Sequence, residues 1–192
     1  MALAVLATIV GPGTGLWQLT TALILAGGVI GYLLASKVEM TQMPELVAGM
    51  HALVGLAAVF VGFNAHFELV NVLGMDPSAK KALEGFAALL AKKSAVEINI
   101  LRVEASLGIW IGAVTFTGSV IAYGKLAGKV TSAATKLPGG HTLNAIAAIS
   151  SLACLVWYLN SGELLPLGIL TALALFIGFH LIMGIGGADM PV

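Results

Sequence analysis

The apolar run between Leu46 and Phe67 restricts the fold of this chain more than any other stretch. It supplies roughly the 20 residues that an α-helix needs to cross the hydrocarbon core of a bilayer. Pro44 stands just before it and is well placed to open a helix, because the missing N–H of a proline has no intrahelical partner at the first helical position. We therefore predict a membrane-spanning helix over residues 45–67.

An ionisable side chain, His51, lies inside this predicted helix. It stands roughly 10 Å below the helix start, which is too deep for an ordinary headgroup contact. Histidine changes charge near neutral pH, so His51 could accept a proton from one side of the membrane and release it to the other. The alternative is a hydrogen bond that only holds two helices together. The residue by itself does not decide between the two interpretations.

Composition places the whole chain in the membrane class. The sequence is 59% hydrophobic and 9% charged, with a mean hydropathy of +1.02, whereas about a quarter of the residues in soluble domains are charged. Nine basic and nine acidic residues cancel, which leaves no basic surface for nucleic acid. The single cysteine, Cys154, cannot form an internal disulfide. We find no motif typical of a metal site or a catalytic nucleophile, and we predict neither.

The remaining apolar stretches predict an all-α integral membrane protein with a bundle of about six transmembrane helices. Ten residues of helix rise only about 15 Å, so we expect the first span to begin outside this chain. Arg102 and His180 lie near the ends of their spans and are expected at headgroup level or in packing. We predict that 1–192 forms a single transmembrane domain, with spans at approximately 1–10, 16–36, 45–67, 96–124, 142–159 and 164–185.

Residues 77–93 follow a different pattern. Asp76 and Pro77 form a helix-start signal, and the residues after them place apolar side chains on one face and most lysines elsewhere. This pattern predicts a short amphipathic interfacial helix lying along the membrane surface. Lysine and arginine are almost equally divided between the two predicted faces, so charge does not orient the chain in the membrane.

Three segments resemble the membrane domain of the proton-translocating NAD(P) transhydrogenase, in the part carried by its β subunit. They are, in chain order, KVEMTQMPELVAGMHALVGLAAVFVGFNAH, GAVTFTGSVIAYGKLAGK and IGGADMPV. The resemblance extends over nearly all of the chain and is weakest through residues 69–100. In that family, two soluble domains pass a hydride between NAD(H) and NADP(H), and the membrane domain couples this transfer to proton movement.

The resemblance implies roles for particular residues. It makes His51 the central protonatable group of the proton path, and it places Asp189 on the face towards the NADP(H)-binding domain. Asn64, further along the same predicted helix, could extend a water path, although helix packing is the alternative. The chain would hold no catalytic residue for hydride transfer and no cofactor, because NAD(H) and NADP(H) would be bound by partner domains. It departs from the family pattern at Gln42, where an acid is expected.

The resemblance also implies a membrane location, an orientation and partners for this protein. The protein would be a multi-pass protein of the cell inner membrane, with Asp189 on the cytoplasmic side and the 77–93 helix facing outward. The β membrane region of the family begins one span earlier and continues two spans past Asp189, so we expect this chain to be a fragment. Its expected partners are membrane lipid, the α-subunit membrane helices and NAD(H)-binding domain, the NADP(H)-binding domain, the other β-subunit helices and a second copy of the assembly.

Two other classes of function are kept as alternatives. An independent ion or proton-coupled transporter would bind its substrate at a broken helix near the bilayer midplane, and no such interruption is evident inside a predicted span. A structural membrane scaffold would tolerate replacement of His51 and Asp189 but not of the glycines that let helices approach.

Overall fold

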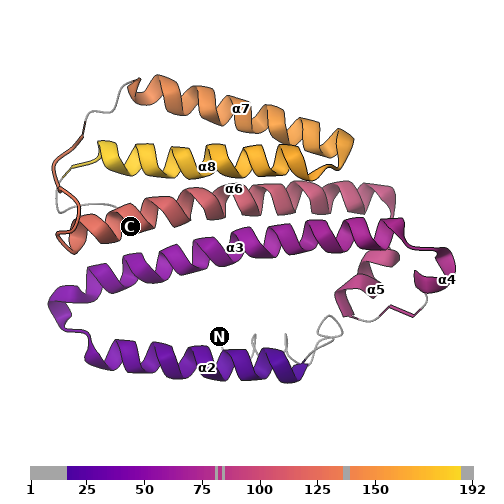
Figure 1. Ribbon diagram of the computed structural model, residues 1–192, viewed down its shortest axis with the longest axis horizontal. Coiled ribbons are helices and arrows are strands. Elements are labelled where there is room, and N and C mark those ends of the chain that lie inside the picture. The colour runs from indigo at the N-terminus through magenta and orange to yellow at the C-terminus, as the bar shows by residue number, and fades with distance from the viewer. Residues whose placement is uncertain (1–16, 81, 84, 136–138, 187–192) are drawn as a thin grey trace. The chain divides into compact units, whose positions relative to one another are not determined.

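The computed structural model describes residues 17–80, 82–83, 85–135 and 139–186 (Figure 1). Every regular element in these ranges is helical, and five of the helices are long and apolar enough to cross a membrane. The prediction of an all-α membrane protein is therefore confirmed. The predicted span at 1–10 lies outside the described residues.

The long helices lie where the other five spans were predicted, and α3 and α6 extend beyond the predicted ends. The extensions carry polar residues such as Glu68 and Lys125, which continue the helices past their apolar centres. In chain order the elements are α2 (Trp17–Lys37), η1 (Met40–Gln42), α3 (Met43–Gly74), α4 (Pro77–Lys80), α5 (Gly85–Ala91), α6 (Ala95–Leu126), α7 (Gly140–Ser161) and α8 (Leu164–Gly184).

The chain forms two compact units. One comprises residues 1–39 and 67–98, and the other comprises residues 40–66 and 99–192. Helix α3 begins in the second unit and ends in the first, so each unit contains part of it. The second unit holds the predicted proton-path residue His51 and the helices α7 and α8.

In the first unit, the stretch predicted as one interfacial helix contains two short helices, α4 and α5. Gly85 begins α5 with a φ of 63°, a left-handed value that interrupts a continuous α-helix and that glycine adopts without steric cost. Helix α6 then starts from a capping box. The backbone N–H of Ser94 donates to Oε2 of Glu97 at 2.8 Å, and the N–H of Glu97 donates to Oγ of Ser94 at 3.4 Å.

In the second unit, α3 packs on α6 along a seam of small residues. Gly55 and Gly112 bring the two backbones together, since a Cβ on Gly55 would lie 2.7 Å from the carbonyl oxygen of Gly112. Apolar side chains gain little from leaving lipid, so such close backbone approach provides the van der Waals contact that holds membrane helices together. The buried α3 positions of this unit repeat at alternating intervals of four and three residues and are Ala48, Ala52, Gly55, Val59, Gly62 and His66.

Helix α8 lies between α6 and α7 (Figure 1). The Thr117 hydroxyl on α6 donates to the carbonyl oxygen of Leu175 on α8 at 2.9 Å, across a contact that Gly178 makes possible. The link between α7 and α8 is short because Gly162 adopts a φ of 67° and its N–H caps the carbonyl of Tyr158 at 2.8 Å. The buried core of this unit contains Val59, Ile109, Ala113, Tyr158, Leu167, Leu170 and Ala174.

Replacing Gly112 by alanine should destabilise the protein by about 1–3 kcal/mol, because the new Cβ would lie 2.6 Å from the carbonyl oxygen of Gly55 and would force α3 and α6 apart. Gly108→Ala, one turn earlier on α6, is the matched control because a Cβ there meets nothing within 4 Å. Thermal unfolding in detergent should show a lower midpoint for Gly112→Ala only. Equal midpoints for the two variants would contradict the seam.

Candidate functional site

His51 lies beside the α3–α6 seam and not within it. Its neighbours Ala48 and Ala52 are buried, whereas the His51 side chain is exposed in this chain. Its Nδ1 lies 2.9 Å from the carbonyl oxygen of Val47, one turn back along α3. A carbonyl only accepts, so Nδ1 is the donor in this bond, and in the neutral ring Nε2 has the free lone pair. His51 therefore presents a proton-accepting nitrogen on a face of α3 that the seam does not use.

Asn64 is also exposed, but it does not share a face with His51. The two residues are separated by about 20 Å along the helix axis and by about 140° around it. Helix α3 therefore does not bring the two side chains together. Asp189, the third predicted site residue, lies outside the described residues, which end one segment after α8.

A second histidine on α3 was missed by the sequence argument. His66 is 4% exposed and its Nδ1 is hydrogen-bonded to the hydroxyl of Tyr158 on α7 at 2.9 Å. The two rings are tilted against each other, with centroids 5.5 Å apart. His66 continues the four-and-three spacing of the buried α3 positions, so periodicity along the predicted helix was the signal that could have found it.

Arg102, on α6, lies closer to the protein interior than the expected headgroup contact. It is half-buried, and Nη1 donates to the carbonyl oxygen of Leu159 at 3.4 Å. A Cβ on Gly162 would lie 2.8 Å from Nη2, so the guanidinium packs directly against the turn that joins α7 to α8. The role of Arg102 in this unit is therefore to bind the end of α7.

Lys125 caps the end of α8 from the last turn of α6. Its side chain is 4% exposed, and Nζ donates to the carbonyl oxygens of Ile182 at 2.9 Å and Ile185 at 2.7 Å, with Met183 at 3.4 Å. The last carbonyls of a helix have no intrahelical partner and carry partial negative charge, which an ammonium group satisfies. The N–H of Thr135 adds a bond to the carbonyl of Met183 at 3.1 Å. The predicted span 96–124 ends one residue before Lys125, so the sequence did not indicate this cap.

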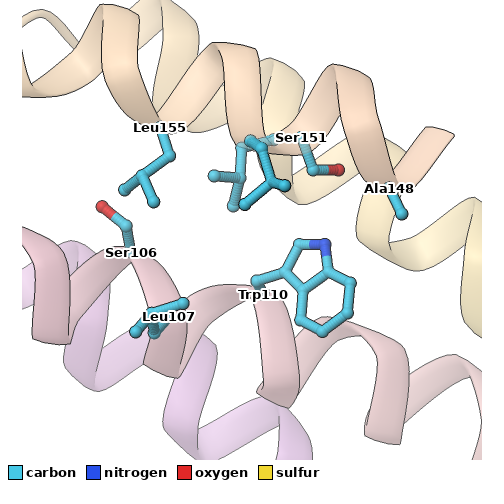
Figure 2. A pocket seen from close by; sticks show the side chains of 8 residues that line it. Ser106, Leu107, Trp110, Ala148, Ser151 and Leu155 are labelled. Carbon is cyan, nitrogen blue, oxygen red and sulfur yellow. The ribbon is translucent and has the colours of Figure 1, made fainter. Parts of the chain in front are cut away.

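A pocket between α6, α7 and α8 is apolar (Figure 2). It has a volume of about 190 Å³ and is bordered by Leu107, Trp110 and Leu155. The hydroxyls of Ser106 and Ser151 also border it, but each donates to a carbonyl of its own helix, at 2.6 Å and 2.8 Å. This pocket therefore suits hydrocarbon and offers no titratable group.

The fold and these sites define a multi-pass, all-α membrane protein with ionisable side chains on and between its helices. A sequence profile of the NAD(P) transhydrogenase beta subunit matches residues 1–192. Two proteins of Rhodospirillum rubrum, each named NAD(P) transhydrogenase subunit beta, are 40% identical to the chain over all of its 192 residues. The chain belongs to the NAD(P) transhydrogenase beta subunit family. It spans 38% of the length of these relatives.

Replacing Lys125 by methionine should loosen the end of α8, because hydrogen bonds from a charged group contribute about 1.5–3 kcal/mol and the carbonyls would lose them. Hydrogen exchange measured by mass spectrometry should become about tenfold faster or more in the peptide that contains residues 182–186. Lys129→Met is the control, because Lys129 is exposed and its ammonium lies over the Tyr123 ring, 5.6 Å from the centroid. Unchanged exchange in Lys125→Met would refute the capping role.

Tyr158→Phe should lower the free energy of unfolding by about 1 kcal/mol, because it removes the hydroxyl that is hydrogen-bonded to Nδ1 of His66 and keeps the ring. Tyr123→Phe removes a hydroxyl from an exposed tyrosine and should have no measurable effect. Unfolding curves in a denaturing detergent would compare the two. A loss of similar size in both variants would mean that the buried bond contributes nothing specific.

Proposed function

We propose that this chain is part of the proton-conducting membrane portion of an NAD(P) transhydrogenase, and that His51 is the protonatable group of the path. In this proposal the chain works within an enzyme complex, and separate soluble domains transfer the hydride between NADH and NADP⁺. Membership of the transhydrogenase beta subunit family supports the assignment. The exposed imidazole of His51, held through Nδ1 beside a packed seam, is the observation that carries the role of this residue.

The geometry of His51 suits a proton carrier better than a residue that only holds two helices together. A residue that holds α3 against α6 would lie on the seam, as Gly55 and His66 do, whereas His51 lies outside it. The bond from Nδ1 to the Val47 carbonyl fixes the ring and leaves Nε2 to accept a proton from water or from a partner side chain. The imidazolium then releases that proton on the other side when its surroundings change.

The exposure of His51 also indicates where the partners belong. An ionisable group in contact with hydrocarbon is costly, so side chains of this kind face a bundle interior or a water-filled cavity. We therefore place the α-subunit membrane helices or the other β-subunit helices against this face of α3. A path from His51 to Asn64 has to pass around the helix, because the two residues lie on different faces.

The proposed coupling runs through the segment after α8. There, Asp189 would face the NADP(H)-binding domain, while the NAD(H)-binding domain belongs to the α subunit. The redox state of the bound NADP would bias the proton affinity of His51, and His51 would bias nucleotide binding equally, because coupling free energies are reciprocal. The assembly would be a homodimer in the inner membrane, surrounded by lipid.

His51→Ala should abolish proton movement by the complete assembly while the soluble domains still exchange hydride, because alanine cannot bind a proton. The measurement is reverse transhydrogenation in sealed vesicles with a pH-sensitive dye inside. Met50→Ala is the matched control, because Met50 is exposed, adjacent to His51 and not ionisable. Normal acidification by His51→Ala would contradict the role of His51 as the protonatable group. Normal acidification without any nucleotide-binding domain would favour an independent transporter.

A further inference from the structure

The end of α8 and the beginning of α7 border a pocket that the path through His51 does not use. Its volume is about 420 Å³, and all of its lining residues belong to the second unit. His141 and Asn144 contribute from α7, His180 and Gly184 from α8, and Thr135 from the connection between α6 and α7. We call it the α7–α8 pocket.

His180 is the most deeply buried polar side chain of the α7–α8 pocket. It is 7% exposed, and its ring is stacked on that of Phe176, with centroids 5.4 Å apart and planes at 27°. Neither Nδ1 nor Nε2 has a hydrogen-bond partner among the described residues. The same holds for Oδ1 of Asn144, which reaches the pocket from the opposite helix.

Internal water is the usual solution to such a deficit. A buried polar atom without a partner costs about 1–3 kcal/mol, and native proteins commonly satisfy such atoms with internal water. A water site needs room and two to four polar partners. The α7–α8 pocket has room for several water molecules, and Thr135, His141, Asn144 and His180 place polar groups around it.

Charged and titratable groups from three elements lie near His180. The ring lies in the last turns of α8, whose carbonyl end carries partial negative charge. The ammonium of Lys125 on α6 binds the carbonyls of Ile182 and Ile185 on the same turns, and the exposed His141 faces the pocket from α7.

We propose that the α7–α8 pocket is a water-filled vestibule, and that His180 is the group in it that binds and releases a proton on the side of the membrane where α8 ends. This inference rests on the proposed function. The imidazole accepts a proton from a hydronium ion, which leaves as water, and the imidazolium later returns the proton to a water on the other side of the ring. His180 ends each cycle as it began, and the vestibule forms one aqueous end of the path.

Access of water to His180 can be measured without any enzymatic assay. With Cys154, the single cysteine of this chain, replaced by serine, cysteine is introduced as His180→Cys or as Phe179→Cys in the complete assembly. Phe179 is the depth-matched control, since it is adjacent on α8, 42% exposed and not part of the pocket lining. A charged, membrane-impermeant thiosulfonate is added on the side of the membrane where α8 ends, because only a hydrated thiolate reacts quickly.

The cysteine of His180→Cys should react at least about tenfold faster than that of Phe179→Cys, because the vestibule hydrates it. An equal or slower rate would overturn the proposal.

Proton pumping by His180→Gln and His180→Phe then tests the protonation of His180 itself. Phenylalanine keeps the stack on Phe176, and glutamine keeps hydrogen bonding, so both variants should lose about tenfold or more of the pumping rate and keep hydride exchange.

The outcomes separate this proposal from the proposed function. Wild-type pumping in either substituted enzyme would show that His180 carries no proton, while His51→Ala could still abolish pumping. If a variant fails to assemble, the labelling rates in the cysteine pair still decide whether water reaches this position. If the wild-type assembly moves no protons, the proposed function is wrong. Fast labelling at position 180 would still show that water reaches the vestibule.

Discussion

Close backbone approach between α3, α6 and α8 is the interaction on which the second unit depends. Lipid tails are as apolar as the side chains of the helices, so burying leucine against leucine gains little in a membrane. The unit relies on contacts that bulky residues would prevent, at Gly55 against Gly112 and at Gly178 against Val114. These contacts fix the helices closely enough for side chains such as Thr117 to bond across them.

Once the helices are this close, each buried polar group needs a partner from a neighbouring element. Backbone groups at helix ends have no intrahelical partner, and in the membrane region water is scarce. Lys125 satisfies the end of α8, Arg102 binds the end of α7, and Tyr158 bonds to His66. The two exceptions among the side chains of α7 and α8 are Asn144 and His180, which adjoin the same pocket. Among the described residues, Nε of Arg102 and Nε1 of Trp110 on α6 are also buried without a partner, whereas Asn144 and His180 share the α7–α8 pocket, which has room for water.

Much of the fold could be predicted from the sequence, because hydrocarbon imposes one requirement on every span. Apolar runs of sufficient length have to be helical there, and Pro44, which was expected to open a helix, is the second residue of α3. Local chemistry was harder to predict where a helix had to be interrupted. The amphipathic pattern of 77–93 is compatible with one helix, whereas α4 ends at Lys80 and α5 begins at Gly85 with a left-handed φ.

The sequence by itself determined the membrane class, the approximate helices and the presence of His51 inside one of them, because composition and length are local properties. The tertiary structure decided which face of α3 packs, and therefore that His51 lies beside the seam and His66 lies on it. It alone showed that Lys125 caps α8 and that the described residues give His180 no hydrogen-bond partner. Partners from elements that are distant in the chain depend on helix rotation and register, which no periodicity within one helix specifies.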